Sequence, residues 1–185
     1  MQSIEFNKAQ VKLVKKTLGN IKKGAPTVIR RAVNKTATQA KTLASKEIRK
    51  VVNLKAKLVG QHIVINRANF KSLTARMKIS GKPIGLLQYG ARQTKTGVSV
   101  RVRKGRKIEK HKSHFIAKMK SGHRGVFERR IINGKRAGRL PLDEKVGPSI
   151  PAVFQFNAEK QVTLVSAVNL QKNLDHEILY LLSKQ

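Results

Sequence analysis

One stretch of the sequence decides how the chain folds: IRRAVNKTATQAKTLASKEIRKV, residues 29–51. Its apolar and small side chains recur at spacings of three and four residues, which places them on one face of an α-helix. The members of this face are Ile29, Val33, Ala37, Ala40, Ala44, Ile48 and Val51. Small side chains in its middle let a neighbouring element or subunit approach closely. We therefore predict a long helix with Ala37, Ala40 and Ala44 as interface residues.

Three further helices are predicted around this one. Residues 5–22 have an amphipathic pattern that ends in KKGAP, residues 22–26. After the long helix, Asn53 is typical of an N-cap, and residues 54–63 are predicted to form a short helix. A last helix covers about residues 158–182. Its predicted apolar stripe, which supplies the interface candidates Leu170, Leu174 and Ile178, consists of Leu164, Ala167, Leu170, Leu174, Ile178 and Leu181.

The middle of the chain, residues 71–132, changes to a strand-like pattern. Residues 73–79 and 97–103 alternate apolar and polar side chains, and residues 114–119 and 125–132 are further strand candidates. Residues 140–151 contain three prolines and are predicted to be irregular. We predict an α+β fold in which N-terminal helices pack on a small, mainly antiparallel sheet and a C-terminal helix follows. Residues 1–157 form the basic α+β region, and residues 158–185 form the C-terminal helix.

The charge of the chain is strongly unbalanced. Its 185 residues include 41 Lys and Arg but 9 Asp and Glu, which gives a net charge of +32. Residues 143–185 hold four basic and five acidic residues, so residues 1–142 carry +33. Because like charges repel in a compact chain, such an excess implies a polyanionic partner, either nucleic acid or an acidic protein surface. No apolar run approaches the ~20 residues of a membrane helix, and no signal peptide is predicted.

The sequence predicts no catalytic residue, metal site or cofactor. Cysteine is absent, which excludes disulfides, thiolate metal sites and cysteine nucleophiles. Glu109 and Glu128 could approach each other across two strands, but in so basic a chain we expect them to neutralise Lys or Arg. His111 and His114 have a spacing found in metal sites, yet the surrounding positive charge would repel a cation.

The region richest in functional candidates is the basic block of residues 92–112, which contains one acid, Glu109. We predict a hairpin with arginines on one face of its second strand and a Lys- and Arg-rich turn. Such a hairpin suits contacts with phosphate groups, which give affinity without reading sequence, or with an acidic protein surface. The candidates are Arg92, Lys95, Arg101, Arg103, Lys104, Arg106, Lys107 and Lys110.

Three blocks of sequence resemble motifs of a known family. They are GKPIGLLQYGARQTKTGVSVRV (81–102), HFIAKMKSGHRGVFER (114–129) and RLPLDEKVGPSIP (139–151). In this order they resemble the central motifs of the phage minor tail protein Z family, and the long helix with NKTA (34–37) and VNLKAK (52–57) is similar too. The resemblance spans about residues 25–155. One departure is Val146, where relatives tend to have a tyrosine before Gly147.

This resemblance implies a structural protein of a tailed-phage virion that has no enzymatic activity. It implies a role late in tail assembly, at the neck where the tail joins the head, with an effect on how the genome end sits in the tail. The implied partners are further copies in a ring, sixfold by analogy with tail tubes, the tail terminator, tail tube and head–tail connector proteins, and genomic DNA. Assembly in the bacterial host cytoplasm is expected. Composition alone suggests an alternative, a ribosomal or other RNA-binding structural protein. A nuclease would need an acidic metal cluster, which the nine scattered carboxylates do not suggest.

Overall fold

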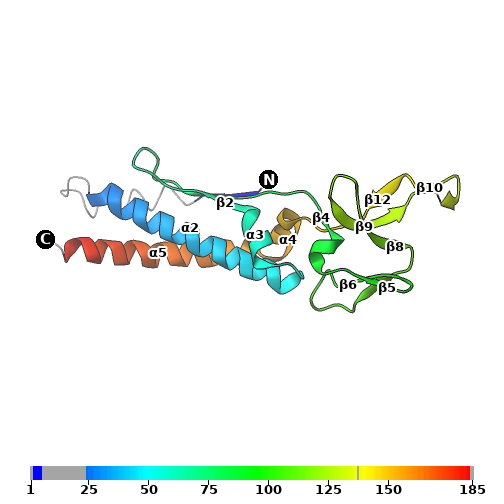
Figure 1. Ribbon diagram of the computed structural model, residues 1–185. Helices are drawn as coiled ribbons and strands as arrows, with labels where there is room; N and C mark the ends of the chain where they lie inside the picture. The colour runs from blue at the N-terminus through cyan, green and yellow to red at the C-terminus, as the bar shows by residue number, and fades with distance from the viewer. Residues whose placement is uncertain (1, 6–23, 137, 184–185) are drawn as a thin grey trace.

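The computed structural model describes residues 2–5, 24–136 and 138–183. The molecule is elongated, with long helices at one end and small β-sheets at the other (Figure 1). The predicted α+β class is confirmed, including the C-terminal helix. The helix predicted over residues 5–22 lies outside the described residues, apart from Glu5, which belongs to strand β1 (Gln2–Glu5).

Helix α2 (Gly24–Val51) is the predicted long helix, and it runs antiparallel to α5 (Glu159–Leu182) (Figure 1). Its alanine row is fully buried, with Ala37, Ala40 and Ala44 at most 1% exposed. Between the helices, the Asn173 amide donates hydrogen bonds to Thr36 Oγ1 and to Gln39 Oε1, each at 2.9 Å. Buried polar contacts of this kind fix one register, because a shifted helix would leave these groups unpaired.

The buried face of α5 differs from the predicted stripe. Leu170 and Leu174 are buried, and Ile178 and Leu181 pack on the core as predicted. Leu164 and Ala167 are instead exposed. The rest of the buried face consists of Val162, Ser166 and Asn173. The prediction was wrong for the first half of the helix, because the predicted stripe began at Leu164 and so missed Val162 and the polar Ser166.

A three-stranded antiparallel sheet, in the order β1–β3–β2, joins this helical end. Its other strands are β2 (Ile63–Asn66) and β3 (Arg76–Ile79). Ile63, Met77 and Ile79 are at most 1% exposed and belong to the same core as α2. Strand β2 begins where the short helix was predicted to end, so α3 (Ala56–Gln61) is shorter than predicted. Asn53 is not its N-cap, because Lys55 holds that position.

The other end of the molecule consists of small antiparallel sheets instead of the single sheet that was predicted. They are β5–β6–β7, β12–β9–β8, β13–β4 and β10–β11. Their strands are β4 (Ile84–Gly85), β5 (Arg92–Thr94), β6 (Gly97–Val100), β7 (Glu109–His111), β8 (His114–Lys118), β9 (Arg124–Arg129), β10 (Ile131–Ile132), β11 (Lys135–Arg136), β12 (Leu142–Glu144) and β13 (Val146–Gly147). A 3-10 helix, η1 (Leu86–Tyr89), follows β4.

Residues 140–151, predicted to be irregular, contain β12, β13 and the beginning of α4 (Ile150–Asn157). Helix α4 has a regular start, because the Ser149 side chain accepts a hydrogen bond from Ala152 N and Pro151 lies in the first turn. This helix packs against α2. The prolines therefore separate short elements and do not prevent them.

Tyr89 joins the two ends of the molecule. Its ring is fully buried, and its hydroxyl donates a hydrogen bond of 2.6 Å to the carbonyl of Pro148. Its own carbonyl accepts a bond of 2.9 Å from Asn53 Nδ2, beside the end of α2. Burial raises the pKa of Tyr89 to about 12, so the phenol stays a hydrogen-bond donor at neutral pH. A methyl group on Gly147 would lie 2.6 Å from the ring, so only glycine leaves room there.

We predict that Gly147→Ala destabilises the protein, because the added methyl group displaces the Tyr89 ring. The expected loss in free energy of unfolding is about 1–3 kcal/mol, measured by urea denaturation. The control is Gly105→Ala, where an added methyl group meets nothing within 4 Å. That variant should stay within about 0.5 kcal/mol of the unmodified protein. Equal stabilities of the two variants would contradict this packing.

Candidate functional site

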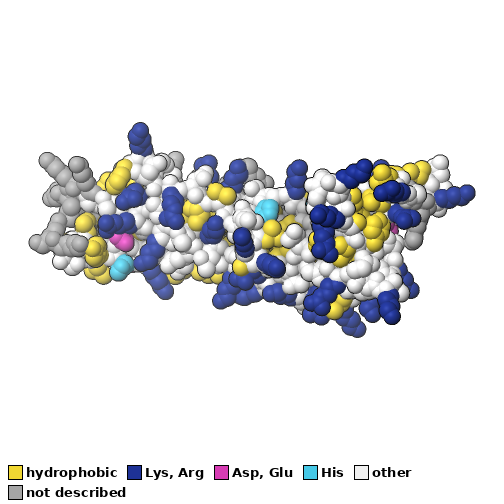
Figure 2. All heavy atoms as spheres, viewed as in Figure 1, with side chains coloured by type: hydrophobic (Ala, Val, Ile, Leu, Met, Phe, Trp, Pro, Cys, Tyr) yellow, Lys and Arg dark blue, Asp and Glu magenta, His cyan; other side chains and the backbone are white. Residues whose placement is uncertain are grey.

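The candidate site is the segment of residues 92–110, here called the basic hairpin, which contains β5, β6, the loop that follows β6 and the first two residues of β7. All eight basic candidates lie on this segment, and all of them are exposed. The space-filling view shows Lys and Arg side chains crowded over this end of the molecule, with few acids in sight (Figure 2).

The strand register decides which way the hairpin presents its charge. Arg92, Ser99 and Lys110 are directly opposite one another across the three strands. Residues that alternate with them, Val98 and Val100, are about 1% exposed and face the core. Side chains alternate between the two faces of a sheet, so Arg92 and Lys110 share its outer face, about 10 Å apart. Strand β6 therefore turns an apolar face towards the core, and the outer face of the sheet carries Arg92 and Lys110.

The loop after β6 holds five more cations close to the end of α2. Lys104 N donates a hydrogen bond of 2.9 Å to Val51 O, and Asn53 N donates one of 2.9 Å to Val102 O. These bonds anchor the loop to the long helix. The strand itself ends at Val100. The prediction that Arg101 and Arg103 share one face of a continuous strand was therefore wrong. The five cations are Arg101, Arg103, Lys104, Arg106 and Lys107.

The cations of the basic hairpin lack acidic partners within the described part of the chain. None of the eight lies within 4.0 Å of a carboxylate there. The acid of the hairpin, Glu109, lies 3.6 Å from His111. Eight exposed and uncompensated cations form a surface with a strong positive potential, which attracts polyanions.

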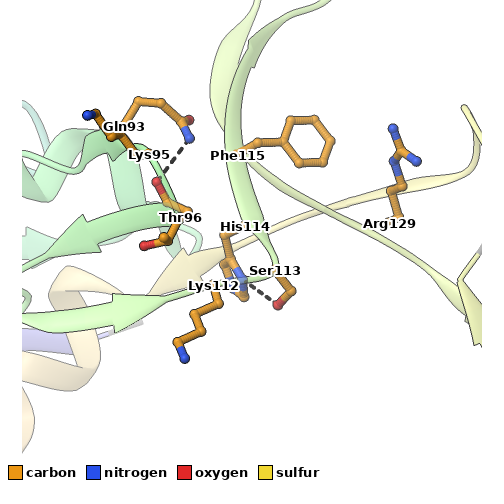
Figure 3. Close-up of a pocket in the computed structure, with 9 residues that line it drawn as sticks. Gln93, Lys95, Thr96, Lys112, Ser113, His114, Phe115 and Arg129 are labelled. Carbon is orange, nitrogen blue, oxygen red and sulfur yellow. Dashed lines mark hydrogen bonds between the residues drawn. The ribbon is translucent and has the colours of Figure 1, made fainter.

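A hollow of about 450 Å³ lies beside the hairpin, next to β8 (Figure 3). Lys95 and Lys112 line it from the hairpin side and Arg129 from β9. Gln93 holds this edge in place, because its amide donates to Gly97 O at 2.9 Å and accepts from Ile116 N at 2.7 Å. Arg129 was missed by sequence reasoning, since its position depends on how β9 packs beside the hairpin.

His114 lines this hollow and also a second one of about 410 Å³, which includes Arg103 and Arg106. Burial lowers the pKa of His114, so it is neutral at pH 7, although the Glu128 carboxylate opposes this effect. Its ring stacks on that of His111, with centroids 4.6 Å apart. Among the described residues, no three His, Asp or Glu side chains gather in a way that could hold a metal ion.

The acids of this end are used to hold strands together. Glu128 accepts hydrogen bonds from Lys145 Nζ and Ser113 Oγ, both at 2.7 Å. These bonds lower the pKa of Glu128 to about 2, Lys145 having the largest effect. The predicted neutralising role of Glu128 is therefore confirmed. Nearby, Asp143 accepts three hydrogen bonds from the Arg130 guanidinium, two from Nε at 3.1 and 3.2 Å and one from Nη2 at 2.6 Å. Both carboxylate oxygens are engaged, which is the bidentate geometry of a strong pair.

Comparison with known proteins identifies the family. A family model described as "Prophage minor tail protein Z (GPZ)" matches residues 11–184. The chain belongs to this family. The match is wider than the motifs, which span residues 25–155. No curated protein and no solved structure matches the chain.

Membership in the minor tail protein Z family makes this chain a structural protein of the phage tail, and so a component of the virion. It supports this role over the RNA-binding alternative, and a structural family favours a chain without enzymatic activity. No helix in the described ranges is both long and apolar enough to span a lipid bilayer.

The interface candidates outside the hairpin lie inside the chain. Ala37, Ala40, Ala44, Leu170 and Leu174 are at most 4% exposed, and Ile178 packs against the same core. Their close packing joins α2 to α5 of the same molecule. They therefore do not form an exposed contact surface, because a partner would reach them only if the helix pair opened.

We predict that Glu128→Gln destabilises the protein in a pH-dependent way. At pH 7 the expected loss is about 1 kcal/mol, because solvent screens a carboxylate that is 24% exposed. The folded pKa of Glu128 is depressed, so its contribution is present above pH ~4.5 and disappears as the pH falls towards 2. Urea denaturation of both proteins at pH 7 and pH 2.5 measures this difference. An equal difference at both pH values would contradict the ion pair.

Proposed function

We propose that this chain acts in tail completion and in joining the tail to the head at the neck, where its basic hairpin contacts a polyanion. Its family membership supports a structural role in the tail. The observation that carries the finer proposal is the set of eight exposed cations without acidic partners in the described residues. Contact between such a surface and a partner is electrostatically favourable only when the partner carries negative charge.

Genomic DNA is the polyanion that we propose first. Contacts with phosphates are independent of sequence, which suits a surface that meets whichever sequence lies at the genome end. Four arginines among the eight cations add the planar, forked donors that fit phosphate oxygens. The second candidate is an acidic surface on a neighbouring protein of the neck, which the same charges would also attract.

We further propose that several copies form a ring around the channel, with sixfold symmetry by analogy with tail tubes. A ring would multiply the eight cations of each hairpin around one DNA end. The neighbours in this proposal are the tail terminator, the tail tube and the head–tail connector. Assembly would take place in the cytoplasm of the bacterial host.

We predict that replacing Arg101, Arg103, Arg106 and Lys107 together with Ser lowers the yield of infectious particles and leaves the fold intact. These side chains are exposed, so their removal costs little stability. If they contact phosphates, the slope of log K against log salt for DNA binding should become shallower by about 3–4. Plaque-forming units per particle and DNA binding at several salt concentrations measure the two effects.

The matched control removes four exposed cations elsewhere: Lys55, Lys71, Lys82 and Lys120, each replaced by Ser. Both variants lose the same charge, so a general charge effect would appear in both. Lower yield with unchanged DNA binding by the hairpin variant would point to the acidic protein surface. Normal infectivity with all four hairpin residues replaced would refute a role of the hairpin at the neck.

A further inference from the structure

Helix α5 has one face that is buried against the rest of the chain and an opposite face that is exposed. One face packs on α2 and includes Val162, Ser166 and Leu170. The opposite face carries exposed apolar side chains: Val165, Val168, Leu179 and Leu182 are 37%, 55%, 67% and 50% exposed. At about 100° per residue, the centres of these faces lie on opposite sides of the helix axis. Among the described elements, α5 packs mainly on α2 and also contacts α4, and the second face stays exposed.

The exposed face follows the repeat of a coiled coil. We call it the outer seam, and its members are separated by four and three residues in strict alternation. They are Gln161, Val165, Val168, Lys172, Asp175, Leu179 and Leu182, all of them exposed. The seam has two apolar pairs, Val165 with Val168 and Leu179 with Leu182. Between these pairs lie the charged residues Lys172 and Asp175.

We propose that the outer seam pairs two copies of this chain, with their α5 helices antiparallel. A two-fold axis between residues 173 and 174 places each Lys172 against the partner's Asp175. The same axis places each Val168 against the partner's Leu179 and each Val165 against the partner's Leu182. The seam residues occupy the a and d positions of a heptad repeat. Each facing pair then joins an a position of one helix to a d position of the other, as in antiparallel coiled coils.

The central charges select this orientation. In a parallel pair the two Lys172 side chains would meet, and so would the two Asp175 side chains. Like charges placed in direct opposition are destabilising, whereas the antiparallel pair forms two ion pairs in the same space. Polar residues at the centre of a seam commonly determine register in this way.

The charge of the rest of the chain favours the same contact. Helix α5 has three acids, Glu159, Asp175 and Glu177, and two bases, Lys160 and Lys172, so it carries −1 in a chain of +32. The basic hairpin lies towards the N-terminal end of α5 (Figure 1). Antiparallel pairing separates the two ends from which the hairpins extend by about 40 Å of helix, well beyond the Debye length of ~8 Å in physiological salt. Two strongly basic chains can therefore meet here with little repulsion.

This pairing goes beyond the proposed role at the neck and does not depend on it. A two-fold contact closes on itself with two copies, so a ring would require other surfaces. Loss of pairing would leave the proposed function of the hairpin standing. Loss of the hairpin's function would equally leave the seam intact.

The test is a charge exchange on the full chain, followed by sedimentation velocity over concentrations on the order of 1–100 μM. The unmodified chain should dimerise with rising concentration at ~0.15 M salt. Lys172→Asp and Asp175→Lys should each raise the dissociation constant roughly tenfold or more, because each creates two like-charge contacts. The double exchange should restore dimerisation. The control, Lys160→Asp, lies off the seam and should dimerise normally.

Cysteine pairing tests the orientation, since the chain has no cysteine of its own. A mixture of Val168→Cys and Leu179→Cys chains should oxidise to mixed dimers. Val168→Cys alone should not, because antiparallel pairing keeps the two copies of this residue about 16 Å apart, too far for a disulfide. A monomer at every concentration, no rescue by the double exchange, or efficient dimers of Val168→Cys alone would overturn the proposal.

Discussion

Nine carboxylates cannot neutralise 41 lysines and arginines, so the position of each acid matters more than in an ordinary protein. Three of the nine, Glu128, Asp143 and Glu144, lie on β9 and β12 and form ion pairs or hydrogen bonds at the sheet-rich end. Held together by these pairs, the sheets support a neighbouring hairpin whose own cations have no such partners in the described residues. The shortage of acid thus leaves one exposed surface strongly positive, and such a surface attracts negative charge.

The helical end meets a different constraint. Alanines along α2 let α5 lie close to it, and the amide of Asn173 fixes the register through Thr36 and Gln39. Tyr89 and Gly147 then connect this helix pair to the sheets, because a ring that is fully buried requires a glycine against it. Two of the family motifs, residues 81–102 and 139–151, are in contact here, because the first supplies Tyr89 and the second supplies Gly147 and Pro148.

Much of this fold could be predicted from the sequence, because long helices repeat one pattern many times. The end of α2, the bounds of α5 and the inner face of β6 follow from the sequence pattern. Short elements gave too few repeats: β2 was hidden behind a helical pattern, and the prolines of residues 140–151 concealed β12, β13 and α4. Asn53 has the chemistry of a helix cap, but its side chain binds the Tyr89 carbonyl, a contact 36 residues away that no local pattern contains. The hairpin cations were found from composition, whereas Arg129 needed the packing of two sheets.

A family match places the chain in the phage tail, and the finer claim is that its basic hairpin faces negative charge at the junction of tail and head. The most direct measurement is a cryo-electron microscopy reconstruction of that junction in the intact particle. We predict density for this chain at the neck, with residues 92–110 turned towards the DNA in the channel or in contact with an acidic neighbouring protein. Density that places the chain elsewhere in the virion, or that turns this hairpin towards open solvent, would contradict it.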